Sequence, residues 1–278
     1  MKTTVIGMGE IGSILASQMI EHGVMAPADL FVYDRNQYKC DALKKRFFDV
    51  QIAPNLEAAV QQARYIFICV QPVSIAGVLK DIQSLLCEDA NIFISSSNFM
   101  LSEATEVTGA KVSKFLPTVN SAIGRGVIYA AHNYKVTAED AQAFEAIMRK
   151  ICSQLYIVEE KEFAVLNNLA GCAPAFFAYF SQCLCQAVYE RQHSFSYREV
   201  ERIVAETLAA TGQRMIEKDL TFEEICMGVG KPGGITYTAL SALVDQLPAS
   251  MSELVKCSVE KHGKIDQLIS QKFQDLKG

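Results

Sequence analysis

The chain has 278 residues, of which 50% are hydrophobic and 21% are charged, so it can bury a sizeable core as one large domain or two ordinary ones. A net charge of -5, with no basic run longer than the LKKR at 43–46, argues against a nucleic-acid partner. The N-terminus enters an apolar strand without a secretory leader, and no run of 18 apolar residues follows, so we expect a cytoplasmic protein with no membrane partner. The nine cysteines lie mostly in apolar segments, which indicates buried thiols and no metal site.

The chain up to residue 159 alternates short apolar runs with amphipathic stretches, a pattern typical of a parallel sheet covered by helices. We expect strands at residues 3–8, 29–34, 65–70, 91–96, 111–117, 126–131 and 155–159. We expect helices at residues 10–22, 38–47, 73–86, 101–107 and 137–151. The predicted fold class is α/β, with a doubly wound, Rossmann-type sheet in a dinucleotide-binding domain over residues 1–159.

Residues 160–278 contain long helical patterns and no strand pattern, which predicts an all-helical C-terminal domain. The stretch PAFFAYFSQCLCQAVYERQ is apolar nearly all round, and a capping box at Thr221 and Glu224 starts a later helix. A domain this apolar is more easily explained if part of it packs against a second subunit.

A glycine-rich motif follows the first predicted strand. Gly7, Gly9 and Gly12, with Glu10 and Ile11 between them, match G-x-G-x-x-G at the start of a helix, where backbone amides can approach a pyrophosphate. Asp34 ends the next strand, about where a ribose-binding acid is expected, and Arg35 beside it suits a 2'-phosphate. The motif predicts NAD(P)H as cofactor, and the charge of Asp34 slightly favours NADH.

The stretch VGKPGGITYTAL, residues 229–240, interrupts the helical region with Gly230, Pro232, Gly233 and Gly234. Such a loop at a helix start offers amides for a carboxylate and a hydroxyl for a nitrogen. The alternative interpretation is structural: the glycines end one helix, and Thr236 caps a new helix that begins near Tyr237.

Four segments resemble the pyrroline-5-carboxylate reductase family. LAGCAPAFFAYF (169–180) is similar to its Leu-Ser-Gly-Ser-Gly-Pro-Ala-Tyr motif, and KPGGIT (231–236) to its Ser-Pro-Gly-Gly-(Ala/Thr)-Thr loop. ICVQPVSIAGVL (68–79) and FLPTVNSAIGRGV (115–127) follow two further motifs in spacing. The resemblance implies a nicotinamide-binding Rossmann domain and a helical domain, residues 160–278, for substrate binding and dimerisation. Two subunits would intertwine through it, in some members as part of a larger homo-oligomer. The implied reaction is hydride transfer to the C=N bond of 1-pyrroline-5-carboxylate, giving L-proline.

The resemblance also implies roles for individual residues. Thr236 would be the catalytic residue, its hydroxyl contacting the ring nitrogen of a small anionic imine, and its amide would help Gly234 and Ile235 to hold the carboxylate. Lys231 and Gly233 complete the implied substrate site. The implied cofactor residues are Gly7, Gly9, Glu10, Ile11, Gly12, Asp34, Arg35, Val70, Gln71 and Pro72.

Several motif positions depart from the family, and they fall where substrate and nicotinamide are expected: Ala170, Cys172, Ala173, Lys231, Gln71, Thr118 and Asn120. They indicate a divergent member. A reductase of a different small imine or keto acid, and a non-catalytic or regulatory paralogue that binds nucleotide, remain open. A β-hydroxyacid dehydrogenase fits poorly, because Ala164 stands where that class places a lysine before Asn167 and Asn168.

Overall fold

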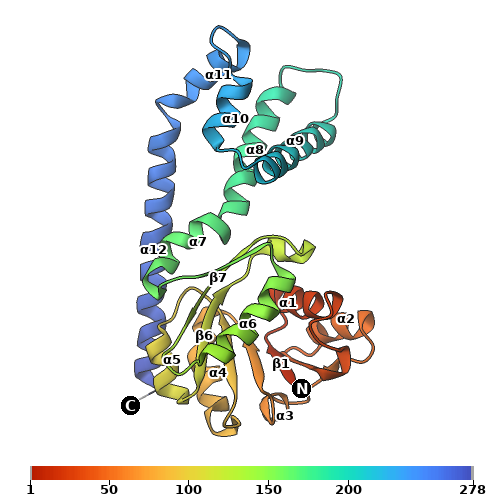
Figure 1. The fold of residues 1–278 in the computed structure, drawn as a ribbon, viewed down its shortest axis with the longest axis vertical. Coiled ribbons are helices and arrows are strands. Elements are labelled where there is room, and N and C mark those ends of the chain that lie inside the picture. Colours follow the sequence, from red (N-terminus) through yellow and green to blue (C-terminus); the bar gives the residue numbers. More distant parts are fainter. Residues whose placement is uncertain (1, 277–278) are drawn as a thin grey trace. The chain divides into compact units, whose positions relative to one another are not determined.

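The structure is a computed structural model that describes residues 2–276. The chain forms two compact units, each described by itself (Figure 1). The first comprises residues 1–172 together with 258–278, and the second comprises residues 173–257.

A single eight-stranded sheet forms the first unit, in the order β3-β2-β1-β4-β5-β6-β7-β8. The strands are β1 (Thr3–Ile6), β2 (Leu30–Tyr33), β3 (Gln51–Ile52), β4 (Tyr65–Ile68), β5 (Asn91–Ser95), β6 (Lys111–Leu116), β7 (Val127–His132) and β8 (Gln154–Ile157). All neighbours pair in parallel except β6 and β7, which are antiparallel. The predicted α/β class is therefore confirmed, with the addition that β7 and β8 run against the other strands.

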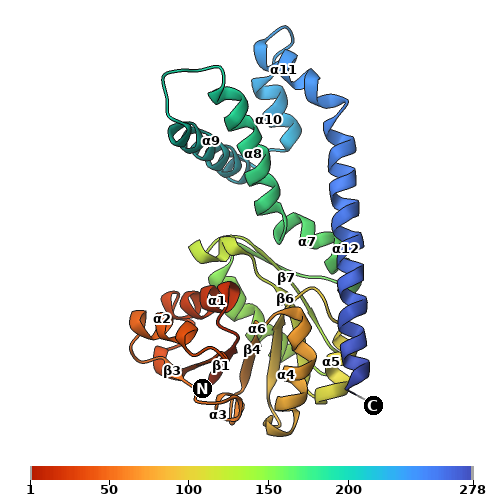
Figure 2. The same cartoon turned by 180° about the vertical axis from the view of Figure 1, so that it is seen from behind.

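Helices cover both faces of this sheet, because successive strand residues point to opposite sides. One face packs against α1 (Glu10–Glu21), α2 (Tyr38–Arg46) and α6 (Ala138–Ile151), around a core that includes Phe67, Phe93 and Phe144. The other packs against α3 (Leu56–Val60), α4 (Ile75–Ile82), α5 (Leu101–Thr108) and α7 (Phe163–Ala170). Figure 2 shows α4 and α5 beside the C-terminal part of α12 (Leu247–Asp275).

The last helix belongs to this second core through its C-terminal half. Ile269 and Phe273 are fully buried there, in one cluster with Phe163 and Ala170 of α7. The sequence predicts a change from mixed to helical structure at residue 160, and all later elements are helices. The boundary between the compact units lies after residue 172 instead, because α7 and the end of α12 complete the core on this face of the sheet.

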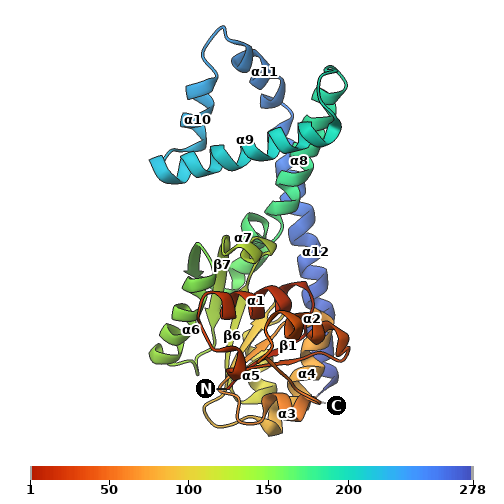
Figure 3. The ribbon, with the colours of Figure 1, turned by 90° about the vertical axis from the view of Figure 1, so that its right-hand side faces the viewer.

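The second unit contains α8 (Ala173–Tyr189), α9 (Tyr197–Lys218), α10 (Phe222–Val229), α11 (Ile235–Val244) and the first part of α12. Figure 3 shows α8 crossing α9, and the rings of Tyr189 and Tyr197 meet edge to face at 5.4 Å. The capping box of α10 is confirmed: the Glu224 N–H donates to Thr221 Oγ1 over 3.1 Å, and the Thr221 N–H donates to Glu224 Oε2 over 2.8 Å.

Large apolar side chains of the second unit are exposed, among them Phe177, Tyr179, Phe180, Leu184 and Val188 of α8. In the described chain, the stretch Glu160–Tyr189 is long and apolar enough to cross a membrane by length and composition alone, and 22% of its most apolar window is buried. Asparagine, serine and glutamine interrupt the apolar run here, so the stretch contains no 18 consecutive apolar residues.

Candidate functional site

The candidate site begins at the carboxyl edge of the sheet, where β1 lies between β2 and β4. The register pairs Ile6 with both Tyr33 and Ile68, so the residues that follow these three strands emerge side by side. This is the point at which the strand order reverses, and open α/β sheets bind ligands in the crevice there.

The loop from β1 to α1 needs glycine at two positions for different reasons. Gly7 has φ of 94°, and a Cβ there would lie 2.7 Å from the Cys69 carbonyl oxygen. A Cβ at Gly12 would lie 1.9 Å from the Gly7 carbonyl oxygen, so a side chain would push α1 off the loop. At Gly9, which caps α1, a Cβ would have no neighbour within 4 Å. The space over Gly9 therefore adjoins the free amides of α1 and fits a pyrophosphate.

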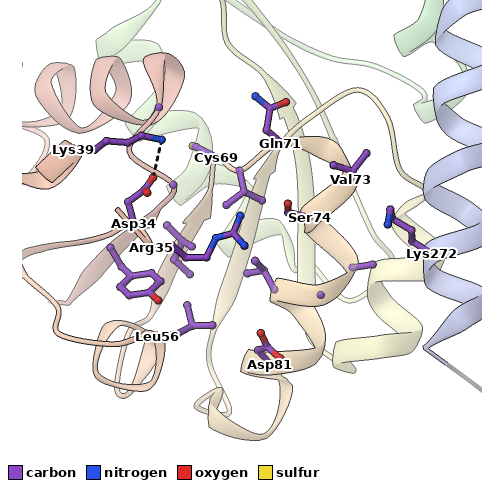
Figure 4. Close-up of a pocket in the computed structure, with 18 of the residues that line it drawn as sticks. Asp34, Arg35, Lys39, Leu56, Cys69, Gln71, Val73, Ser74, Asp81 and Lys272 are labelled. Atoms are coloured by element: carbon purple, nitrogen blue, oxygen red, sulfur yellow. Dashed lines mark ion pairs between the residues drawn. The ribbon is translucent and has the colours of Figure 1, made fainter. Parts of the chain in front are cut away.

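Asp34, at the end of β2, holds this loop. Its Oδ2 accepts a hydrogen bond of 2.9 Å from the Met8 N–H, and its Oδ1 accepts one of 2.9 Å from the Asn36 N–H. The ammonium of Lys39, in the first turn of α2, lies 3.7 Å from Oδ2 (Figure 4). The carboxylate thus joins the glycine-rich loop to the β2–α2 connection and has a cation beside it.

The β1–α1 loop and the end of β2 form one side of a cavity of about 570 Å³. This size is typical of small-molecule and cofactor sites. Figure 4 shows the Arg35 side chain extending from the end of β2 toward Ser74 on the opposite wall. That wall consists of the end of β4, a 3-10 turn (Pro72–Ser74) and α4. Lys272 at the end of α12 closes the far side. Open space at Gly9, free amides and a cation at the β2 end together fit a dinucleotide.

The cavity brings together part of the cofactor site expected from the sequence. Gly7, Gly9, Asp34, Arg35, Val70 and Gln71 line it. Among the described residues Glu10, Ile11, Gly12 and Pro72 are not in its lining. Gly12 acts indirectly, by letting α1 approach the loop.

Further lining residues were not predicted: Lys39, Leu56, Val73, Ser74, Asp81 and Lys272. Lys39 lies shortly after Asp34, so a search for cations near the β2 end would have found it. No sequence motif marks Lys272, because the packing of Ile269 and Phe273 into the core brings α12 to this wall.

The loop at residues 231–236 lies in the second unit. Gly233 has φ of 80°, and Gly234 takes an extended conformation as the N-cap of α11. The helix begins at Ile235, two residues before the expected start, and Thr236 is inside its first turn, so Thr236 is not the cap. Thr238 Oγ1 donates to the Gly234 carbonyl over 3.2 Å. Thr236 Oγ1 has no hydrogen-bond partner among the described residues.

Comparison with known proteins finds a family-model match for each of the two regions. Residues 160–265 match the family model described as pyrroline-5-carboxylate reductase dimerisation, and residues 2–98 match the model described as NADP oxidoreductase coenzyme F420-dependent. The chain is 24% identical over 268 residues to pyrroline-5-carboxylate reductase 3 of Bacillus subtilis, covering 96% of this chain and 97% of that protein. Residues 160–265 thus match the pyrroline-5-carboxylate reductase dimerisation model, and nearly the whole chain is similar to proteins named pyrroline-5-carboxylate reductase.

Solved structures of pyrroline-5-carboxylate reductases have the same fold as this chain. A pyrroline-5-carboxylate reductase from Coxiella burnetii superposes with a TM-score of 0.85 at 18% identity, covering 95% of this chain and 98% of the other. The Plasmodium falciparum enzyme, solved with NADP bound, superposes with a TM-score of 0.81 at 20% identity, covering 96% and 97%. The matched models support NAD(P)H as the cofactor and homo-oligomerisation through the helical region.

Proposed function

We propose that the protein reduces 1-pyrroline-5-carboxylate to L-proline with NAD(P)H. The observation that carries the proposal is the Gly-Gly-Ile-Thr turn at the start of α11, in a chain related over its whole length to pyrroline-5-carboxylate reductases. When bound, the cofactor would supply a hydride to the carbon of the C=N bond, and the nitrogen would take its proton from solvent. The chain has to position the imine and exclude water.

The turn at residues 233–236 is the proposed substrate site. The first amides of a helix have no intrahelical acceptor, so those of Ile235 and Thr236 are available to the substrate carboxylate. The Thr236 hydroxyl, which no described residue engages, is the proposed partner of the ring nitrogen. Lys231, exposed just before the turn, adds a positive charge for an anionic substrate.

The first unit holds the cofactor in this proposal. Gly9 and the first amides of α1 would hold its pyrophosphate, and Arg35, Val73 and Ser74 would border its adenosine. The sequence prediction of a slight NADH preference rests on the negative charge of Asp34 facing a 2'-phosphate. Arg35 favours a 2'-phosphate, so the preference between NADH and NADPH depends on how far cations offset the charge of Asp34.

A homodimer formed through the C-terminal helices is part of the same proposal. The apolar side chains exposed on α8, such as Phe177 and Tyr179, need a cover, and a second copy of the same helices supplies one. This also accounts for a stretch that has the composition of a membrane span. Because a second copy, and not a membrane, would cover this stretch, we propose a cytoplasmic location.

The proposal is tested by incubating the purified protein with 1-pyrroline-5-carboxylate and following the absorbance of NADH and NADPH. We expect oxidation of the cofactor together with formation of L-proline. Nucleotide binding without oxidation would point to the non-catalytic paralogue. Turnover of other small imines, with pyrroline-5-carboxylate left unchanged, would point to a different substrate. The altered residues Ala170, Cys172 and Lys231 are the observation that keeps this second candidate under test.

A further inference from the structure

The Asp34 carboxylate forms its hydrogen bonds with backbone N–H groups of the protein. Both of its oxygens accept a backbone N–H, Oδ2 from Met8 and Oδ1 from Asn36, and the carboxylate is largely buried, with 13% of the side chain exposed. An aspartate that binds a ribose through both oxygens presents both to the cavity. Here the carboxylate instead fixes the position of the glycine-rich loop relative to β2.

The charge of Asp34 is offset from within the site. Lys39 Nζ lies 3.7 Å from Asp34 Oδ2, and Lys39 itself lines the cavity. Figure 4 shows the Lys39 side chain reaching over Asp34, with Arg35 extending into the cavity beyond them. The β2 end therefore presents one carboxylate and two cations.

We propose that Lys39 is a specificity-determining residue, which allows the site to accept NADPH as well as NADH. The inference rests on the proposed function for the class of cofactor only. A 2'-phosphate brings about two negative charges and strong acceptor oxygens to the position beside Asp34. An unpaired aspartate would repel it. With Lys39 beside the carboxylate, that repulsion is offset, and the planar guanidinium of Arg35 can bind the phosphate through two N–H groups.

NADH remains a ligand in the same arrangement. Each carboxylate oxygen has more than one lone pair, so Asp34 Oδ1 can accept a ribose hydroxyl in addition to the Asn36 N–H. Adenine and pyrophosphate contacts are common to both cofactors. NADPH and NADH therefore differ at one point of the site. There Lys39 contributes to the binding of NADPH and is dispensable for NADH.

The test measures dissociation constants of the full chain for NADPH and NADH by nucleotide fluorescence. Competition by 2',5'-ADP and by ADP gives a second comparison, in which no nicotinamide takes part. For the unaltered protein we expect the two cofactors to bind within about tenfold of each other. In Lys39→Met we expect the ratio of NADPH to NADH affinity to fall by about tenfold or more, since a charge-assisted contact is lost.

Two matched variants separate specificity from structure. Lys39→Arg keeps the charge and should restore the ratio. Lys45→Met removes an exposed lysine from the last turn of the same helix and should leave the ratio as it is. An equal loss of both affinities in Lys39→Met would show that Lys39 only supports the fold and would overturn the proposal.

Asp34→Asn tests the other half of the pair. The amide keeps an oxygen for the Met8 N–H and removes the negative charge, so NADPH should bind more tightly. A loss of NADH affinity of about tenfold or more would make Asp34 a principal ribose ligand and overturn the inference. Failure to bind either nucleotide would overturn both proposals, whereas binding in the expected ratio without pyrroline turnover would overturn only the proposed function.

Discussion

The Lys114 ammonium, on β6, lies 3.0 Å from Glu160 Oε1, at the point where the chain leaves the sheet for the C-terminal helices. Lys114 is 2% exposed and also donates a hydrogen bond to the Phe99 carbonyl. Glu160 Oε1 accepts a second bond, of 2.7 Å, from the Leu101 N–H at the start of α5. Burial lowers the pKa of Lys114, and the neighbouring Glu160 carboxylate opposes that shift. Through these bonds, the Lys114–Glu160 pair connects β6, the start of α5 and the beginning of the helical region.

Replacing Lys114 by methionine should destabilise the fold, because it leaves the Phe99 carbonyl and Glu160 without their partner. We expect a loss of roughly 2–3 kcal/mol, since Glu160 is partly exposed and can be hydrated. Urea denaturation measures it. Lys161→Met removes an exposed ion pair with Glu159 and should cost less than about 0.5 kcal/mol. Similar losses in both variants would contradict the role given to burial.

Gly9, the N-cap of α1, and Gly12, in its first turn, should respond differently to alanine. Gly12→Ala places a methyl group against the Gly7 carbonyl and should lower the thermal stability as well as cofactor binding. Gly9→Ala has room in the protein, so its melting temperature should stay within about 2 °C while cofactor affinity falls about tenfold. Calorimetry and nucleotide titration distinguish them, and a Gly9→Ala protein that binds cofactor normally would place the pyrophosphate elsewhere.

Asp140 links stability to acid pH. Its burial by itself would raise the carboxyl pKa, but hydrogen bonds from Lys111, Thr137 and Asn91 outweigh burial and lower the pKa to about 2 from 3.8. Because the folded pKa lies below the unfolded one, the stabilisation is present above about pH 4 and is lost as pH falls toward 2. By linkage it amounts to about 2 kcal/mol.

Asp140→Asn should therefore be less stable than the unaltered protein at pH 7, with the difference shrinking between about pH 4 and pH 2. Denaturant melts across this range provide the measurement. Glu145→Gln is the control, because its ion pair with Arg149 is more exposed. A difference independent of pH would mean that the carboxylate charge contributes nothing.

Thr236 and Thr238 form a matched pair for the proposed chemistry. The Thr238 hydroxyl is engaged within α11, whereas the Thr236 hydroxyl has no partner among the described residues. We expect Thr236→Ala to lower kcat for pyrroline-5-carboxylate by about 10- to 100-fold, and Thr238→Ala to change it less than about threefold. Equal kcat values for Thr236→Ala and the unaltered protein would remove the hydroxyl from the mechanism.

Lys231 should act on substrate binding rather than on hydride transfer. A charge near an anionic substrate raises affinity in a salt-dependent way, so Lys231→Met should raise KM about threefold to tenfold at low ionic strength and leave kcat nearly unchanged. Steady-state kinetics at two salt concentrations measure both effects. Lys218→Met, in the last turn of α9, is the control cation. A KM insensitive to salt in every variant would make Lys231 an ordinary surface lysine.

Much of the first unit could be predicted, because its strands are apolar runs bounded by turn residues. The missed elements, β3 and α3, are two and five residues long, too short for periodicity to reveal them. The predicted helix at 73–86 is divided by two 3-10 turns around α4. The direction of β7 was also missed, because a short apolar run is compatible with a strand in either direction. A connection of ten residues between β6 and β7, short for a crossover, favours the antiparallel arrangement.

The candidate site was predictable where its chemistry is local. Gly7, Gly9 and Asp34 belong to a motif with fixed spacing. The tertiary role of Asp34 was not visible, because its bond to Met8 depends on the register of β1 against β2. Lys272 reaches the cavity because Ile269 and Phe273 pack into a core built mostly by the first part of the chain.

That packing bears on the order in which the protein can fold during synthesis. The sheet unit is interrupted in the chain by the whole of the helical unit, and Ile269 and Phe273, both fully buried, arrive last. A nascent chain that has completed every strand still exposes the apolar groove that these two side chains fill. The helical unit must therefore emerge from the ribosome before the nucleotide-binding unit can close its core, and a chain truncated just before Ile269 would lose the stability of a domain that lies almost entirely upstream.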